Sequence, residues 1–423
     1  MNYAFLPDLS ALAILIVILY LLYRRHPQEQ AGTWLAGLLF TLIEAMAHIF
    51  YARTGVPAAI LHVIVLVCYL IAGLIFIWAS GGPHLSRNRR LLYLSLNGFP
   101  LLMLNTTYGL NVRMPAAYFP AIALGIIVGT ASTLYLRRSW FLTVANFCGW
   151  LTIAFLVHQG DFRSAVYWSL SCVYAIAAIN FQKRLPREST GRLAIVIGFF
   201  TWALCFLLHP WIVQHPAYVE IASHVWNMQK SLISIGMILV MLEEQVSNNA
   251  WLALHDELTG LPNRRLFADR LTHAMGRCRR TKDKLALLVL DLNGFKAIND
   301  TLGHHIGDQV LREVSGKLRA GIRATDTLAR LGGDEFIIVA TDFSADFAVE
   351  SLADSLLCEI EKPLHIDGRS MTVSASLGIA IYPDDAEDSI KLLRIADQRM
   401  YDIKHKMALT NPINRYPEAS LFQ

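Results

Sequence analysis

Long apolar segments dominate the first 243 residues of the chain. A helix that crosses a lipid bilayer needs about 20 predominantly apolar residues, and about nine segments approach this length. Residues 1–243 are therefore expected to form an all-α polytopic membrane bundle. The nine segments are Tyr3–Tyr23, Trp34–Tyr51, Val56–Ala79, Leu91–Leu110, Pro115–Leu136, Trp140–Val157, Ala165–Phe181, Leu193–Leu208 and Tyr218–Leu242.

Apolar residues then continue along one helical stripe. From Leu239, the residues Leu242, Val246 and Ala253 fall at alternating spacings of three and four, with the polar Asn249 on the same stripe. This pattern is typical of a short parallel coiled coil, and a plain amphipathic linker helix fits it equally well. Residues 239–255 are expected to be a signalling linker helix.

Short segments with strand and helix periodicity follow from about residue 252. They predict a soluble α/β domain over residues 252–410, of ordinary size for one domain, and a C-terminal tail over residues 411–423. The expected strands are Leu285–Leu292, Phe336–Thr341 and Met371–Ile381, and the expected helices are Ile306–Ala320, Ala345–Glu361 and Ser389–Lys406.

Composition supports a membrane protein and argues against a nucleic-acid-binding one. Apolar residues make up 54% of the 423 residues, which is too many for two soluble domains. The formal charge is only +4, and basic residues are scattered at the ends of apolar segments instead of forming one patch.

Loop charges predict the topology, because short cytoplasmic loops are enriched in Lys and Arg. Eleven basic residues follow the first, third, fifth and seventh segments, whereas only Arg53, Arg113 and Arg163 lie in the opposite loops. The N-terminus is therefore expected outside and the C-terminal domain in the cytoplasm. The eleven residues are Arg24, Arg25, Arg87, Arg89, Arg90, Arg137, Arg138, Lys183, Arg184, Arg187 and Arg192.

The segment LDLNGFKAINDTLGHHIGDQVL, residues 290–311, suits a nucleoside triphosphate. A strand delivers Asp291 at its end, a turn with Asn293 and Gly294 follows, and a helix begins near Lys296. A carboxylate can hold Mg²⁺, backbone N–H groups near a helix start can bind phosphate, and a lysine can stabilise developing charge.

A second cluster, RLGGDEF at residues 330–336, lies between two apolar runs. Gly332 and Gly333 indicate a hairpin turn, which is tight enough to let a ligand approach the backbone. Asp334 and Glu335 follow immediately. A purely structural acidic turn is the alternative.

In their order and spacing, these motifs resemble those of the GGDEF diguanylate cyclases. Residues 256–265 (DELTGLPNRR), 291–300 (DLNGFKAIND), 303–308 (GHHIGD) and 332–336 (GGDEF) are each similar to a family motif. The resemblance implies a nucleotidyl-cyclase-like α/β domain with a mainly antiparallel central sheet flanked by helices. It also implies an enzyme that condenses two GTP into cyclic di-GMP and two pyrophosphates.

The family's residue roles then carry over to the matching positions. Asp291, Asp334 and the carbonyl of Leu292 would hold Mg²⁺, with Mn²⁺ as an alternative. Lys296 would stabilise charge on the transferring phosphoryl group, and Asp334 or Glu335 would take the proton from the attacking 3′ hydroxyl. The residues implied in binding GTP are Gly294, Phe295, Asn299, His304, Asp308 and Lys404.

Two positions depart from the family pattern. Asn293 replaces an acidic residue whose side chain need not bind metal, and residues 407–409 (MAL) replace the Gly-Arg-Asn expected after Lys404. The second departure would reduce turnover or GTP affinity. It keeps open a degenerate domain that binds GTP or cyclic di-GMP without turnover. A cyclase making a mixed guanine and adenine dinucleotide is disfavoured by Asp308, which suits the N1 and N2 donors of guanine.

The resemblance also implies a homodimer in a bacterial inner membrane. The ninth segment is polar in its first half, where His224, Asn227 and Lys230 lie, and an interfacial helix is the alternative there. Such a helix would leave a GTP-using domain outside the cell, so we expect the segment to cross.

Two further groups of residues are candidates for regulation. Arg323 and Asp326 match the family's RxxD inhibitory site, which implies feedback by cyclic di-GMP, with an exposed ion pair as the alternative. Glu44 and His48 share one face of the second segment, and His62 lies in the third. Intramembrane ionisable groups can sense a metal, haem, quinone or proton, or can simply hydrogen-bond between helices.

The loop charges generate a topology prediction. A reporter fused after Leu242 should behave as cytoplasmic, and one inserted between Leu208 and Tyr218 should behave as external. Alkaline phosphatase and green fluorescent protein fusions measure this, since each is active on one side only. If both fusions report the same side, the ninth segment does not cross.

Overall fold

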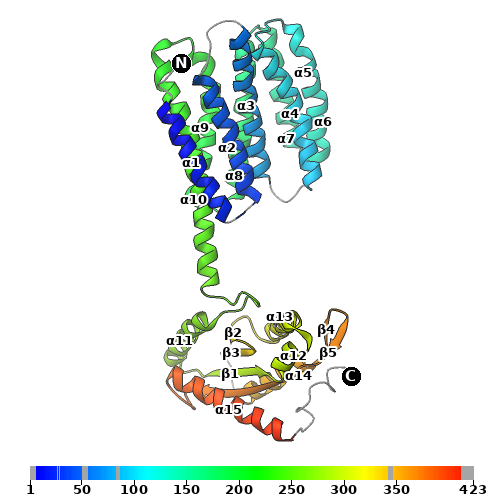
Figure 1. The fold of residues 1–423 in the computed structure, drawn as a ribbon, viewed down its shortest axis with the longest axis vertical. Coiled ribbons are helices and arrows are strands. Elements are labelled where there is room, and N and C mark those ends of the chain that lie inside the picture. Colours follow the sequence, from blue (N-terminus) through cyan, green and yellow to red (C-terminus); the bar gives the residue numbers. More distant parts are fainter. Residues whose placement is uncertain are drawn as a thin grey trace. The chain divides into compact units, whose positions relative to one another are not determined.

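The structure is a computed structural model that describes residues 6–25, 27, 29–49, 56–81, 86–341 and 346–410. The chain divides into two compact units, residues 1–246 and 247–423, and each unit has its own hydrophobic core. Figure 1 shows the helices of the first unit and the sheet of the second. The expected C-terminal tail lies outside the described residues.

The described residues of the first unit form helices joined by short turns and loops. Between α4 and α7 the chain forms one helical stretch that alternates α, 3₁₀ and π turns. The elements are α1 (Leu6–Arg25), α2 (Glu29–Ile49), α3 (Val56–Ser80), α4 (Arg87–Gly109), η2 (Pro115–Tyr118), α5 (Phe119–Leu124), η3 (Gly125–Gly129), α6 (Thr130–Ser132), η4 (Thr133–Arg137), α7 (Trp140–His158), α8 (Phe162–Arg184), α9 (Thr190–Ile212) and α10 (Pro216–Leu252).

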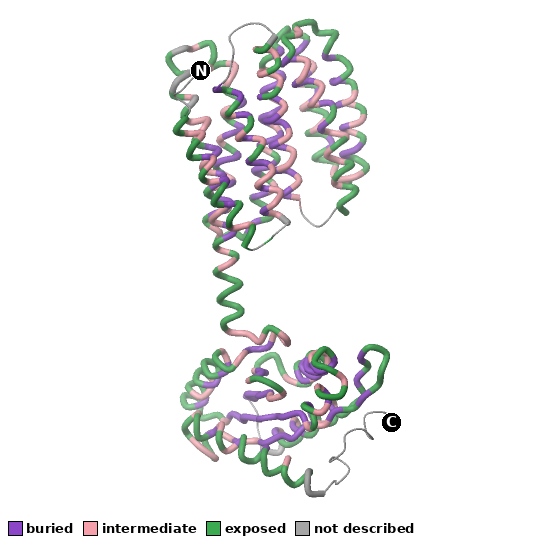
Figure 2. Tube along the Cα trace, in the orientation of Figure 1, coloured by how far each residue is buried: buried purple, intermediate pink, exposed green. Residues whose placement is uncertain are grey.

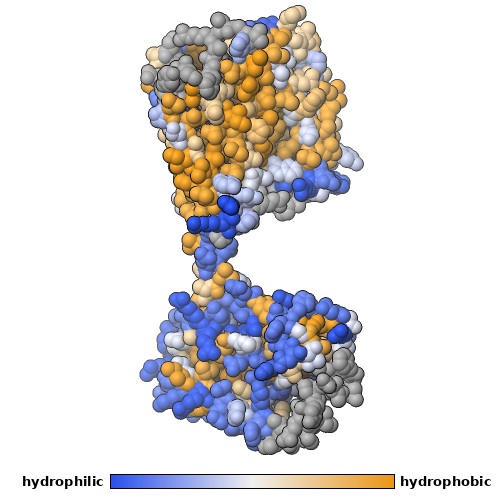
Figure 3. All heavy atoms as spheres, viewed as in Figure 1, coloured by the Kyte–Doolittle hydropathy of each residue, from blue (hydrophilic) through white to orange (hydrophobic). Residues whose placement is uncertain are grey.

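The outer surface of this unit is apolar. Large side chains such as Ile127, Trp140 and Phe141 are more than half exposed, and the view in Figure 3 shows a largely hydrophobic surface. Within the described ranges, eight helical stretches have the length and composition to cross a membrane. Helix α4 covers the fourth expected segment but is not among these eight, so the count of nine spans stays a prediction.

The second unit is an α/β domain, as expected. Its main sheet has the strand order β2-β3-β1-β6, and every neighbouring pair is antiparallel. The elements are α11 (Arg264–Thr281), β1 (Leu285–Leu292), α12 (Phe295–Leu302), α13 (His304–Gly321), β2 (Thr327–Gly332), β3 (Glu335–Thr341), α14 (Asp346–Glu361), β4 (Leu364–Ile366), β5 (Arg369–Met371), β6 (Ala375–Tyr382) and α15 (Ser389–Thr410).

The central strand β1 is buried along its whole length, as the purple strand residues in Figure 2 illustrate. Successive side chains of a strand point to opposite faces of the sheet. Leu288 and Leu290 therefore pack in the core that α12, α13 and α14 cover, whereas Leu287 and Val289 pack in the core that α11 and α15 cover. A strand covered on both faces needs apolar residues at every position, which is why β1 lacks alternation.

The single strand expected over Met371–Ile381 is wrong. The structure has two strands there: β5 pairs with β4 in a separate hairpin, and β6 joins the main sheet. Asp367 and Gly368 both have positive φ, 48° and 76°, the conformation required at the tip of a tight two-residue hairpin. The chain changes sheets over residues 372–374, and the alternation of apolar and polar residues from Met371 to Leu377 continues through this change without a break.

Close packing of β6 against α15 generates a stability prediction. A Cβ on Gly378 would lie 2.1 Å from the carbonyl oxygen of Ala396 and 2.3 Å from the backbone nitrogen of Met400, so backbone would have to move. Gly378→Ala should lower the free energy of unfolding by about 3 kcal/mol or more. Chemical denaturation of residues 247–423 measures this.

The matched control is Gly316→Ala on α13, where a Cβ meets no atom within 4 Å. Alanine is favoured over glycine in a helix interior, so this change should raise stability by about 0.5–1 kcal/mol. Equal effects at the two positions would show that α15 does not hold β6 at this distance.

Candidate active site

Asp291 marks the end of the central strand and is only 8% exposed. Its antiparallel partners are Glu335 on β3 and Ser376 on β6. Directly opposed residues place their side chains on the same face of a sheet, so Asp291 and Glu335 are adjacent like charges, an unfavourable pair on its own. Lys404 of α15 donates a hydrogen bond to Asp291 on this face.

The turn between β2 and β3 brings Asp334 to the same corner. Gly332 and Gly333 have φ values of 145° and 54°, which glycine adopts at little cost. The carbonyl of Asp334 accepts the N–H of Leu292 at 3.4 Å. The turn is thereby joined to the end of β1, and the carboxylates predicted from two separate motifs meet.

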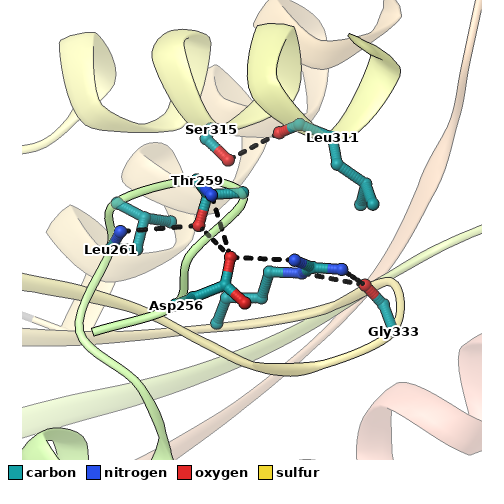
Figure 4. A network of polar contacts seen from close by, with 7 residues as sticks. Asp256, Thr259, Leu261, Leu311, Ser315 and Gly333 are labelled. Carbon is teal, nitrogen blue, oxygen red and sulfur yellow. Dashed lines mark hydrogen bonds and ion pairs between the residues drawn. The ribbon is translucent and has the colours of Figure 1, made fainter. Parts of the chain in front are cut away.

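Arg330 fixes this turn through a network of hydrogen bonds. No role for Arg330 was predicted from the sequence. Its guanidinium donates to the carbonyl of Gly333 from Nε (2.9 Å) and Nη2 (2.6 Å), and from Nη1 to Asp256 (2.8 Å). Asp256 also accepts the backbone N–H and hydroxyl of Thr259, as Figure 4 shows. The only signals in the sequence were that Asp256 belongs to a matched motif and that Arg330 begins the cluster at residues 330–336.

The network is electrostatically satisfied. Burial by itself raises the pKa of the Asp256 carboxyl, but the hydrogen bonds from Thr259 and Arg330 outweigh it and lower that pKa. Arg330 is 9% exposed, and its partners leave no uncompensated buried charge, the condition under which a buried ion pair does not destabilise a fold.

The catalytic candidates show the opposite shift. Burial and then the charge of Asp291 raise the pKa of Asp334. Burial and the charges of Asp291 and Asp397 raise the pKa of Glu335. Asp334 and Glu335, with their raised pKa values, and the neighbouring Asp291 form an acidic corner that would bind a cation.

The turn between β1 and α12 is shaped by Asn293 and Gly294. The side chain of Asn293 donates to Ser374 (3.2 Å) and accepts from Ser376 (2.9 Å), so it ties the turn to β6. Gly294 has φ of 73° and is the N-cap of α12. Asn293 therefore has a structural role here, which accounts for the departure from an acidic residue.

The expected phosphate ligands lie at the start of α12. Gly294 and Lys296 are exposed, whereas Phe295 is buried beneath them. The first N–H groups of a helix have no partner within the helix and can bind an anion.

The two expected guanine ligands lie on adjacent helices. Asn299 is on α12 and Asp308 is on α13, and both are partly buried. A Cβ on Gly307 would lie only 2.0 Å from Oδ1 of Asn299, so the Asn299 side chain packs directly over the residue before Asp308. His304 is exposed in the first turn of α13.

The last helix contributes Lys404 and Met407 to the site. Lys404 contacts Asp291, and Sδ of Met407 lies 4.0 Å from Nδ2 of Asn293. A residue of the unusual MAL segment therefore touches the turn that precedes α12.

Arg323 and Asp326 lie apart from this corner, in the turn between α13 and β2. The carboxylate of Asp326 accepts two backbone N–H groups, from Arg323 at 3.1 Å and from Thr341 at 3.2 Å. Asp326 thus ties the turn to the end of β3, while Arg323 is exposed.

The corner supplies part of the ligand shell of a magnesium ion, and water and substrate phosphate would supply the rest. Within the described ranges, no group of three or more His, Cys, Asp and Glu side chains could hold a metal. Mg²⁺ commonly takes one or two carboxylates and completes its shell with water and substrate phosphate. Asp291, Asp334 and the Leu292 carbonyl match that requirement, and the ammonium of Lys404 on Asp291 shows that the corner accepts a cation.

Comparison with known proteins places residues 253–409 in the family described as diguanylate cyclase, GGDEF domain. The chain is 47% identical over 154 residues to the bifunctional diguanylate cyclase/cyclic di-GMP phosphodiesterase MucR of Pseudomonas aeruginosa, covering 36% of this chain and 22% of MucR. It is 37% identical over 166 residues to the diguanylate cyclase TpbB of the same organism, covering 39% of this chain and 38% of TpbB. The chain therefore spans well under half the length of these relatives.

Among solved structures, the chain is similar to a truncated form of TpbB that comprises only its GGDEF domain. The identity is 38%, the match covers 36% of this chain and 89% of that one, and the TM-score is 0.35.

The crowded carboxylates generate a prediction for Asp334→Asn. A raised pKa in the folded state means that the fold holds the proton more tightly than the unfolded chain does, so stability falls as pH rises through the carboxyl range. At pH 7.5 the carboxylates repel one another, and the neutral amide should leave the melting temperature equal or higher. This advantage should vanish below about pH 4.

Thermal unfolding with and without Mg²⁺ measures this. Mg²⁺ should stabilise the wild type more than Asp334→Asn. The control is Asp354→Asn, an exposed carboxylate on α14, which should show neither effect. A marked loss of stability in Asp334→Asn alone would mean that the carboxylate supports the fold.

Proposed function

Through residues 253–409 the chain belongs to the GGDEF family, and from that premise we propose that it is a membrane-bound diguanylate cyclase that condenses two GTP into cyclic di-GMP and two pyrophosphates. The observation that carries the proposal is the corner where Asp291, Asp334 and Glu335 meet at adjacent strand ends. Its crowded carboxylates, beside the exposed start of α12, are arranged for a cation and a triphosphate.

The chain's own residues would do most of the work by placement. The N–H groups of Gly294 and Phe295 and the ammonium of Lys296 would orient the phosphates. Lys404, once released from Asp291, would add a positive charge. In-line attack on an α-phosphate depends on such positioning and charge neutralisation more than on covalent help.

Glu335 or Asp334 would accept the proton of the attacking 3′ hydroxyl, and their raised pKa values suit a base. Magnesium, or manganese in its place, would be held by Asp291, Asp334 and the Leu292 carbonyl and would neutralise phosphate charge. Asn299 and Asp308 would read the guanine edge, with His304 beside the nucleoside.

The proposed active form is a homodimer, since the reaction joins two GTP molecules. The C-terminal part of α10 supports a dimer contact, because Leu242 and Val246 are 40% and 68% exposed. Exposed apolar residues on one stripe of a helix are suited to pairing with a second copy. Residues 239–255 would then serve as the linker.

We place the chain in the bacterial inner membrane, with the N-terminus outside and residues 252–410 in the cytoplasm. Support comes from the eight apolar stretches, from the basic loops and from the need for cytoplasmic GTP.

The decisive experiment incubates the detergent-solubilised full-length chain with GTP and Mg²⁺ and identifies the product by mass spectrometry. Cyclic di-GMP should form, and Asp334→Ala or Glu335→Ala should lower the rate at least about 100-fold, because each removes an interaction of the reacting groups. Asp354→Ala should behave as wild type. Substantial activity in both site variants would contradict the assignment.

The second candidate, a GTP-binding or cyclic di-GMP-binding module without turnover, is favoured by the MAL segment at residues 407–409. Saturable nucleotide binding with no product over many hours would establish it. A mixed guanine and adenine product, obtained when ATP is added, would instead indicate the related cyclase.

Feedback by the product is the remaining part of the proposal. The guanidinium of Arg323 could hold phosphate in bidentate fashion and stack on guanine. Asp326 would act with it, although its carboxylate already binds two backbone N–H groups. Product bound here would hold two active sites apart without touching them.

Accordingly, Arg323→Ala should leave the initial rate nearly unchanged and abolish the slowing that accompanies product accumulation. Arg319→Ala, also exposed and on the last turn of α13, is the control and should remain inhibited. Progress curves with added cyclic di-GMP measure this. If the wild type is not slowed, or Arg323→Ala is slowed as strongly, the pair has only a structural role.

A further inference from the structure

The first unit contains a cavity of about 240 Å³ between helices. Its lining comes from α1, α2, α3, α8, α9 and α10, and it mixes apolar side chains with aromatic rings and three charged groups, Asp8, Glu44 and Lys230. Ligand sites are largely apolar cavities with a few placed polar groups, and this one is of a size for a small molecule.

The deep end of the cavity is an ion pair. Nζ of Lys230 lies 2.5 Å from Oε2 of Glu44, and the two side chains are 3% and 0% exposed. Oε1 of Glu44 lies 3.0 Å from Nε2 of His48. The negative charge of Glu44 and the positive charge of Lys230 thus compensate each other within the protein. Burying such a pair costs desolvation energy, and ionisable residues in a membrane region are therefore candidates for function.

Aromatic rings form the walls. His209 stacks on Tyr167 with ring centres 3.8 Å apart, and it meets Trp226 edge-on at 5.4 Å. Tyr69 lies 6.4 Å from Trp226 and already faces the ammonium of Lys230 at 5.8 Å. Ring faces attract cations, most strongly where water is excluded.

The remaining charged group is acidic. Asp8 accepts a hydrogen bond from Asn227 at 2.8 Å, and its side chain is 35% exposed, with His224 at 3.9 Å. Since Glu44 and Lys230 cancel, the lining carries a net negative charge when its histidines are neutral. A bound anion would be repelled by Asp8 and would find no uncompensated positive charge in the lining. A bound cation would be attracted by both Asp8 and the aromatic rings.

We propose that this cavity binds a small, largely apolar amine in its protonated form, with the ammonium toward Asp8 and the apolar body against Tyr167 and Trp226.

The cavity is also placed to act on the rest of the chain. Trp226, Asn227 and Lys230 belong to α10, which continues without a break to Leu252. Farther along α10, Glu243 accepts the N–H of Thr190 (2.9 Å) and the hydroxyl of Ser189 (2.5 Å) at the start of α9. A ligand among these residues contacts the helix that leads to the cyclase domain, so it would regulate the proposed activity. This second step rests on the proposed function; the binding step does not.

The test measures binding by calorimetry on the detergent-solubilised full-length chain. The probes are 2-phenylethylamine, the carboxylate 3-phenylpropanoate and the neutral 2-phenylethanol. The amine should bind saturably and at least about tenfold more tightly than the other two. Tighter binding of the carboxylate, equal binding of the alcohol, or no saturable binding of the amine would overturn the proposal.

Two variants locate the site. Asp8→Asn should weaken amine binding about tenfold, and Ala45→Phe, which fills the cavity from its lining, should abolish it. The controls are Asp161→Asn, which preserves the N-cap of α8 because asparagine caps as well as aspartate, and the exposed Ala145→Phe on α7. Both should bind normally. Unweakened binding in Asp8→Asn would overturn the assigned orientation and ligand charge.

The regulatory step has its own readout. Saturating 2-phenylethylamine should change the rate of cyclic di-GMP formation in the wild type and not in Ala45→Phe. Amine binding with an unchanged rate would overturn the regulatory step alone. Amine binding by a chain that has no cyclase activity would support the binding proposal and contradict the proposed function.

Discussion

The pairing of β1 between β3 and β6 is the constraint on which the candidate site depends. This register sets Asp291 opposite Glu335. Two like charges therefore lie together at the ends of β1 and β3, although β1 is otherwise apolar. The fold tolerates this repulsion because the strand is held on both sides and both faces. The unfavourable charge is the feature that makes the corner suited to a cation, and a bound cation would in turn attract a triphosphate.

The rest of the domain supports that corner. Arg330 binds the turn carbonyl of Gly333 and the carboxylate of Asp256 at once, so the residues that position Asp334 are themselves fixed. Asn293 does the same for the start of α12. In both cases the polar groups that shape the site are separate from those that would react. Asp334 and Glu335, which are proposed to react, would therefore remain available to a cation and to substrate.

The first unit uses charge differently. There the buried pair of Glu44 and Lys230 is compensated within the protein, and it connects α2 with the helix that leaves the unit. Glu243 makes a second connection, from α10 to the start of α9. Polar contacts thus hold helix α10 at two positions along its length, Lys230 and Glu243. A ligand or a proton can alter both contacts.

Properties that depend on neighbouring residues could be read from the sequence. The helical bundle and the α/β domain follow from apolar periodicity and short local patterns, whereas the GGDEF family was indicated by the resemblance of four ordered motifs to those of that family. The number of spans stays a prediction, because α4 is the least apolar of the expected segments. The switch between β5 and β6 was missed, because the alternation of apolar and polar residues from Met371 to Leu377 continues through the change of sheet.

Contacts between distant residues were decided by the tertiary structure alone. Arg330 and Asp256 are 74 positions apart, and Lys230 and Glu44 are 186 apart. No local pattern pairs such residues, since their meeting depends on strand register and helix packing set by the whole core. The sequence therefore determined which residues could carry chemistry, and the packing of the sheet and the bundle decided which of them meet.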